Sequence, residues 1–159
     1  MATRIGILNG PNLDLLGVRE PQIYGTTTLA EIERDCRAFA RKIGVALDFK
    51  QSNHEGQLID WIHAARGRSQ ALIVNPAGCS FVSVALFDAM KAFAGPIYEV
   101  HISNIHARDE MHRHSKLSAA ATGVVAGLGP YGYVLALQAA ARAVGHDRSV
   151  SNRKVQGRL

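Results

Sequence analysis

The sequence predicts a single α/β domain built on a doubly wound parallel sheet of five strands. Short apolar runs rich in strand-favouring residues alternate along the chain with segments in which apolar residues recur at helical spacing, and neither a repeat nor a linker interrupts them. The chain has 159 residues, 47% of them apolar, which is enough to bury a core beneath helices on both faces of a sheet.

The elements follow in order. The predicted strands span residues 5–8, 45–49, 71–74, 97–102 and 123–126. Helical periodicity runs from Leu29 to Ile43, recurs at Leu58, Ile59 and Ile62, and continues over 84–93 and 131–144. Capping boxes are predicted at Thr28–Glu31 and at Ser52–Glu55, and Pro130 lies near the first turn of the last helix.

The segment GVREPQIYG, residues 17–25, separates the first strand from the first long helix. Its two glycines and Pro21 exclude a long helix and predict a mobile loop. The loop carries Arg19 and Tyr24, which are either solvated loop residues or parts of a site. A free phenol has a pKa of about 10, and a nearby guanidinium can lower this pKa by about one to three units. The functional interpretation is a hinged flap that closes over a substrate and carries an activated base.

Polar side chains follow three of the predicted strands. Ligands of doubly wound sheets bind beyond the carboxyl ends of the strands. The first strand runs into Asn12, the third ends at Asn75, and the fourth places Glu99, His101 and Ser103 on one face. Such a polar stripe is costly in a buried strand unless it is hydrogen-bonded, so it indicates either a core network or a site. As a site, His101 oriented by Glu99 is a general acid, and a flap base opposite it suits proton abstraction beside a carbonyl with loss of water.

Other motifs are weaker. GLGPYG, residues 127–132, matches the dinucleotide fingerprint but follows the last strand, so it predicts a tight strand-to-helix turn. His101, His106, His112 and His114 lack the spacing of a metal site, and we expect no metal and no cofactor. Cys79 stands alone without a nucleophile motif, and no lysine is placed for imine chemistry.

The charge of +5 does not indicate a nucleic-acid partner. The tail over residues 147–159 contributes +3 of it, and the preceding domain, residues 1–146, shows no basic stripe interleaved with aromatic residues. We expect this tail to be flexible. No apolar run is long enough to span a bilayer, which argues against a membrane partner. With two cysteines and no leader peptide, the cytoplasm is the expected compartment.

Four stretches resemble the type II 3-dehydroquinate dehydratase family: ILNGPNLDLLGVREPQIYGTTTL, SNHEGQLIDWIHAA, EVHISNIHARDE and GYVLAL. The resemblance covers about residues 4 to 145, in order and at matching spacing. It implies a flavodoxin-like fold assembled as a dodecamer, a tetramer of trimers. It also implies anti elimination of water from 3-dehydroquinate, a hydroxylated cyclic keto acid, through an enolate to 3-dehydroshikimate. That step belongs to the shikimate pathway or to quinate metabolism and uses no metal, cofactor or imine.

The resemblance also implies a role for each matching residue. Tyr24 is the base, Arg19 lowers its pKa, and Asn12 helps to hold the water that stabilises the enolate. His101 protonates the departing hydroxyl, and Glu99 orients it. The substrate carboxylate is bound by Asn75, Ser103 and the backbone of Ile102, whereas Asp88 reaches the site of a neighbouring subunit.

Two positions depart from the family. Phe81 stands where the family has a histidine, and His112 stands where it has an arginine, followed here by Arg113. In the family these positions contact the ring hydroxyls at the end opposite the carboxylate, and a hydroxyl left against an apolar face costs about 1–3 kcal/mol. Three hypotheses follow: an ordinary dehydratase in which Arg113 turns into the site, the same elimination on a less hydroxylated substrate, or an idle paralogue that serves as a binding or assembly subunit.

Overall fold

Five parallel strands form one sheet in the order β2-β1-β3-β4-β5. The structure is a computed structural model that describes residues 2–146, so the predicted basic tail lies outside the described residues. The strands are β1 (Arg4–Asn9), β2 (Ala46–Gln51), β3 (Ala71–Asn75), β4 (Ile97–His101) and β5 (Gly123–Ala126). This is the predicted doubly wound, flavodoxin-like sheet, and its strand order reverses between β1 and β3.

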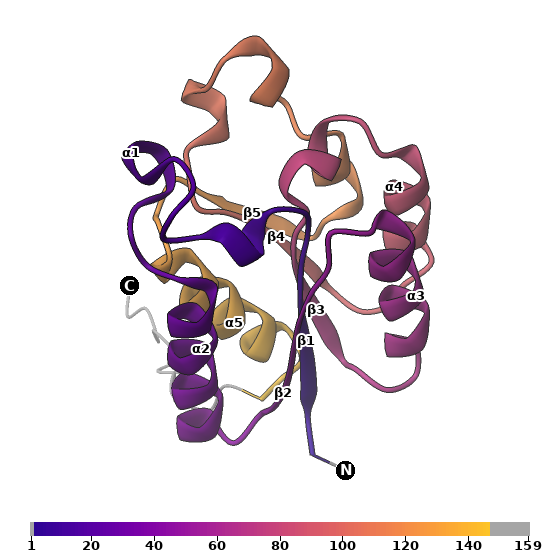
Figure 1. Cartoon of the computed structure of the whole chain (residues 1–159). Coiled ribbons are helices and arrows are strands. Elements are labelled where there is room, and N and C mark those ends of the chain that lie inside the picture. The colour runs from indigo at the N-terminus through magenta and orange to yellow at the C-terminus, as the bar shows by residue number, and fades with distance from the viewer. Residues whose placement is uncertain (1, 147–159) are drawn as a thin grey trace, which may run out of the picture.

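Helices cover both faces of this sheet. They are α1 (Pro21–Tyr24), α2 (Leu29–Ile43), α3 (Glu55–Ala65), α4 (Val84–Lys91) and α5 (Tyr131–Ala143). Helices α2 and α5 lie on one face, and α3 and α4 lie on the other (Figure 1). The four longer helices confirm the predicted ones, and α1 is a single turn inside the predicted flap.

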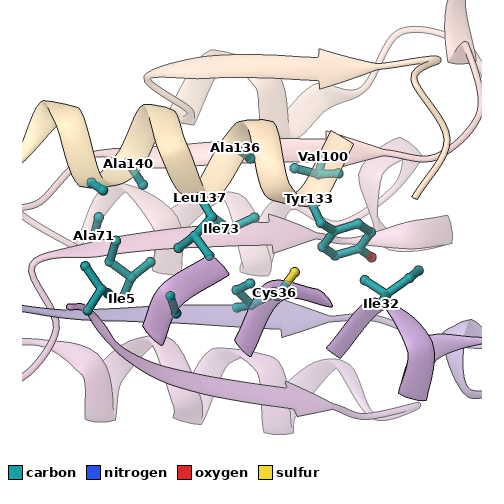
Figure 2. Close-up of a cluster of buried hydrophobic side chains, with 14 of the residues drawn as sticks. Ile5, Ile32, Cys36, Ala71, Ile73, Val100, Tyr133, Ala136, Leu137 and Ala140 are labelled. Carbon is teal, nitrogen blue, oxygen red and sulfur yellow. The ribbon is translucent and has the colours of Figure 1, made fainter. Parts of the chain in front are cut away.

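Alternate side chains of the strands feed two hydrophobic clusters. Ile5 and Ile7 of β1 point toward α2 and α5, whereas Leu8 points toward α3 and α4. Figure 2 shows Tyr133 and Leu137 of α5 in the same layer as Ile73 of β3. The central strands β1 and β3 are buried on both faces and are apolar nearly throughout, whereas the edge strand β2 is only half-buried.

One of the two predicted capping boxes forms. At the start of α2 the Glu31 backbone N–H donates to the Thr28 hydroxyl at 3.2 Å, and the Thr28 backbone N–H donates to the Glu31 carboxylate at 2.8 Å. The box predicted from Ser52 to Glu55 is wrong. His54 is the N-cap of α3 without a side-chain cap, because Glu55 instead accepts a hydrogen bond from the Ser83 hydroxyl, which caps α4.

The carboxyl ends of β1 and β3 lie in register, with Asn9 opposite Asn75. Just beyond them, the Gly10 backbone N–H donates to the Asn75 carbonyl at 2.8 Å. A Cβ at Gly10 would lie 2.5 Å from the carbonyl oxygen of Pro76, so only glycine fits this close approach. The two loops that leave these strands are thereby held together at one edge of the sheet.

Candidate active site

A cavity of about 190 Å³ lies beyond the carboxyl ends of β1, β3 and β4. Nine of the eleven residues predicted for the site line it: Asn12, Arg19, Tyr24, Asn75, Phe81, His101, Ile102, Ser103 and His112. The tenth, Glu99, lies behind His101, and the eleventh, Asp88, is exposed on α4 away from this cavity. The chain therefore brings together residues that are up to a hundred positions apart, as expected at a strand-order reversal.

Glu99 and His101 form a buried pair on β4. The Nε2 atom of His101 lies 2.5 Å from a carboxylate oxygen of Glu99, whose side chain is 0% exposed. Ser118 donates to the other oxygen at 2.6 Å. Burial opposes ionisation of Glu99, but hydrogen bonds from His101, Ser115 and Ser118 outweigh it and hold its pKa below the usual value. The pair thus leaves Nδ1 of His101 as the ring nitrogen for a ligand in the cavity.

Tyr24 enters the cavity from the flap. Gly17 and Gly25, both with positive φ, bound this segment, and the single turn α1 between them carries the phenol. The Nη1 atom of Arg108 donates to the Tyr24 hydroxyl at 3.1 Å and to the Ser103 hydroxyl at 3.3 Å. A cation therefore contacts the phenol oxygen directly.

The cation predicted for this role was Arg19. Its guanidinium lies 5.5 Å from the centre of the Tyr24 ring and pairs with the Glu20 carboxylate at 3.1 Å. Arg108 lies at the same 5.5 Å from the ring and is the residue that sequence reasoning missed. In the sequence Arg108 is visible only as a positive charge seven positions after His101. No sequence pattern shows that the loop after β4 contacts the flap.

Asn75 is held by two hydrogen bonds at the end of β3. Its Nδ2 donates to the buried hydroxyl of Tyr133 at 2.7 Å, and its Oδ1 accepts from the backbone N–H of Ala77 at 3.2 Å. Asn12 also lines the cavity, and its backbone is in the left-handed region, with φ of 67°, which asparagine tolerates. Its backbone N–H donates to the Asn53 side chain at 2.8 Å.

Phe81 and His112 form what we call the far wall of the cavity. Their rings meet edge to face, with centres 5.6 Å apart and planes at 83°. Nδ1 of His112 lies 2.8 and 2.9 Å from the two carboxylate oxygens of Asp109. Arg113 does not turn into the cavity in this structure, because its Nε donates to the backbone carbonyl of Arg108.

Other chemistry has less support in the described part of the chain. Within residues 2–146, no three histidine, cysteine or acidic side chains are grouped so that they could hold a metal ion. Burial raises the pKa of the Cys79 thiol, which keeps it protonated and a poor nucleophile.

No helix within residues 2–146 is long and apolar enough to cross a membrane.

Known proteins share this sequence and fold. The 3-dehydroquinate dehydratase 2 of Agrobacterium fabrum is 56% identical over 132 residues, which cover 83% of this chain and 90% of that protein. The 3-dehydroquinate dehydratase 2 of Pseudomonas aeruginosa is 53% identical over 138 residues, 87% of this chain and 93% of its own. The crystal structure of the type II dehydroquinase from Propionibacterium acnes superimposes with a TM-score of 0.85 at 44% identity, covering 89% of this chain and 98% of that one.

The family model agrees with these relatives and with the resemblance seen in the sequence. The model described as dehydroquinase class II matches residues 3–141, nearly all of the described chain. The chain belongs to the class II dehydroquinase family.

Proposed function

We propose that this protein is a hydro-lyase that eliminates water from 3-dehydroquinate to give 3-dehydroshikimate, in the shikimate pathway or quinate metabolism of the cytoplasm. The curated relatives are named for this activity. The observation that carries the proposal is that one cavity is lined by a phenol in contact with a guanidinium and an imidazole paired with a buried carboxylate. These are a base and an acid, each with its own partner.

Tyr24 is the proposed base. The Arg108 guanidinium donates a hydrogen bond to its oxygen, and the Arg19 guanidinium lies beside its ring, so two positive charges face the proposed base. The phenolate takes the proton from the carbon beside the substrate ketone, and the electron pair of that C–H bond forms the enolate. Arg108 also joins the flap to Ser103, so the contact that activates the base closes the cavity.

His101 is the proposed acid. Because Glu99 is ionised, it accepts the hydrogen bond from Nε2–H, and the proton that leaves is carried on Nδ1. The enolate collapses to a carbon–carbon double bond, the C–O bond breaks, and the Nδ1 proton joins the departing hydroxyl to make water. Glu99 stabilises the imidazolium before the transfer and fixes its orientation.

The remaining lining residues bind the substrate. Asn75, the backbone of Ile102 and the Ser103 hydroxyl bind its carboxylate, and Asn12 helps to hold a water against the enolate oxygen. At the far wall, Phe81 packs against the substrate ring, while His112 binds a ring hydroxyl through Nε2. Asp109 occupies Nδ1 of His112 and so leaves Nε2 for the ligand. His112 thereby supplies a hydrogen bond that the phenyl ring of Phe81 cannot make.

Assembly into a dodecamer, a tetramer of trimers, is the remaining part of the proposal. Asp88 does not line the cavity of its own chain and lies exposed on the outer face of α4. Near it in the sequence are two exposed apolar residues, Val82 at 74% and Val84 at 65% exposure. Exposed apolar side chains beside an acid favour a protein interface through which Asp88 reaches the neighbouring site.

The central test is the rise in enone absorbance when the protein is mixed with 3-dehydroquinate. We expect turnover by the unaltered protein and a loss of kcat of about 10²–10⁴-fold in Tyr24→Phe, because the variant keeps the ring but loses the base. Tyr131→Phe, which removes an exposed phenol at 62% exposure on α5, is the matched control and should not change the rate. Equal rates for Tyr24→Phe and the unaltered protein would refute this mechanism.

A second test concerns the far wall. His112→Ala should raise KM for 3-dehydroquinate by roughly 5- to 150-fold with little change in kcat, since it removes a binding hydrogen bond worth about 1–3 kcal/mol. Glu110→Gln, in the same turn (Glu110–His112) but not lining the cavity, is the control. An unchanged KM in His112→Ala would show that the far wall does not bind a hydroxyl. Faster turnover of an analogue without that hydroxyl than of 3-dehydroquinate would instead favour the less hydroxylated substrate.

Light scattering tests the assembly. A dodecamer of 17.1 kDa chains is the expected species, and Val84→Asp should shift it toward smaller species because it places a charge in the interface. A fully active monomer would contradict both the assembly and the role of Asp88.

A further inference from the structure

A chain of four hydrogen bonds runs through the protein behind the cavity. The backbone carbonyl of Lys50 accepts from Asn9 at 3.0 Å, and Asn9 accepts from the Tyr133 hydroxyl at 2.7 Å. That hydroxyl accepts from Asn75 at 2.7 Å, and Asn75 accepts from the backbone N–H of Ala77 at 3.2 Å. Asn9 and Tyr133 are 0% exposed, and neither lines the cavity.

Both ends of this chain are backbone groups, and they fix its direction. The N–H of Ala77 can only donate, so the atom of Asn75 that faces it is the oxygen, and the nitrogen faces Tyr133. The Tyr133 oxygen accepts from that nitrogen, so its own hydrogen points to the oxygen of Asn9. The nitrogen of Asn9 then meets the Lys50 carbonyl, which can only accept. Reversing any one member would set donor against donor or acceptor against acceptor.

The consequence for the cavity concerns the second hydrogen on Asn75 Nδ2. One Nδ2 hydrogen is used by Tyr133, and the Oδ1 is used by Ala77. Asn75 is 3% exposed and is one of the residues that line the cavity. An asparagine can otherwise rotate its amide by half a turn and present either a donor or an acceptor. In this structure the chain of hydrogen bonds leaves only the second Nδ2 hydrogen of Asn75 for a ligand, so Asn75 can act only as a donor.

We propose that Asn9 and Tyr133 are positioning residues that lock Asn75 as a hydrogen-bond donor toward an anionic acceptor of the substrate, which on the proposed function is its carboxylate. They act from the core, through Asn75, and touch no substrate atom. A locked donor favours an ionised carboxylate over a neutral amide or alcohol at the same place, because a hydrogen bond to a charged acceptor is the stronger one. The tyrosine on α5 thereby connects the end of β1 to that of β3 and contributes to specificity.

A double-mutant cycle between Tyr133→Phe and Asn75→Ala tests this inference. Tyr133→Phe removes the acceptor of one Nδ2 hydrogen and leaves the amide held by Ala77 alone, so it is positioned less firmly. We therefore expect KM to rise about tenfold while kcat changes less than about threefold. Asn75→Ala should raise KM at least as much. If Tyr133 acts only through Asn75, the double variant should be no worse than Asn75→Ala alone. Additive increases in KM, or an unchanged KM in Tyr133→Phe, would overturn the proposal.

Further variants separate positioning from general damage. Tyr131→Phe, on the same helix but exposed, should leave KM unchanged. Asn75→Asp keeps the shape of the side chain but cannot donate, and it should raise KM more than Tyr133→Phe does. If Tyr133→Phe does not fold, Asn9→Leu can take its place in the double-mutant cycle with Asn75→Ala. Asn9→Leu removes the group that accepts the hydrogen bond from the Tyr133 hydroxyl.

Calorimetric binding of 3-dehydroshikimate distinguishes failure of this inference from failure of the proposed function. A protein that binds the compound but shows no turnover would contradict the proposed reaction, and the cycle can then be measured on Kd. A protein that turns over 3-dehydroquinate normally, with Kd and KM unaffected by Tyr133→Phe, would contradict the positioning role alone. Failure to bind or turn over either compound would overturn both.

Discussion

The site depends on a carboxylate buried in the middle of a parallel sheet. Glu99 lies on β4 with no exposed surface, where an unpaired charge would be strongly unfavourable. His101, Ser115 and Ser118 supply hydrogen bonds that make its ionised form the stable one. Because both side chains of this pair are buried and hydrogen-bonded, the fold itself fixes the imidazole at the strand end. The acid of the proposed reaction is thus part of the core.

The base is organised in a different way. Tyr24 lies on a one-turn helix between two glycines and is tied to the rest of the protein by Arg108, from the loop after β4. On the preformed side of the cavity, His101 and Asn75 are hydrogen-bonded to buried side chains. On the flap side, Tyr24 and Arg19 contact side chains that are exposed or partly exposed. Such a division suits a reaction that needs a fixed acid and a lid that opens to release product.

Apolar periodicity predicted the sheet and the long helices, and the rule for strand ends predicted Asn12, Asn75, His101 and Ser103. The composition of the flap pointed to Arg19 and Tyr24, whereas the other three lining residues came only from the resemblance to the family. The sequence also predicted that Glu99 and His101 belong together, since they alternate on one strand. It missed Arg108, because the path of an irregular loop depends on tertiary contacts with the flap. The second capping box was wrong for a related reason: Glu55 pairs with Ser83, 28 positions away, instead of with its own helix end. Whether Phe81 and His112 would meet was likewise beyond any local pattern.

Hydrogen exchange at the substrate carbon separates the two proton transfers of the proposed mechanism. 3-Dehydroquinate is incubated in D₂O with His101→Ala or Tyr24→Phe, and deuterium at the carbon beside the ketone is followed by NMR. If Tyr24 removes the proton and His101 only releases water, His101→Ala should exchange deuterium without forming 3-dehydroshikimate, and Tyr24→Phe should do neither. Exchange in Tyr24→Phe at the rate of the unaltered protein would contradict the assignment of the base.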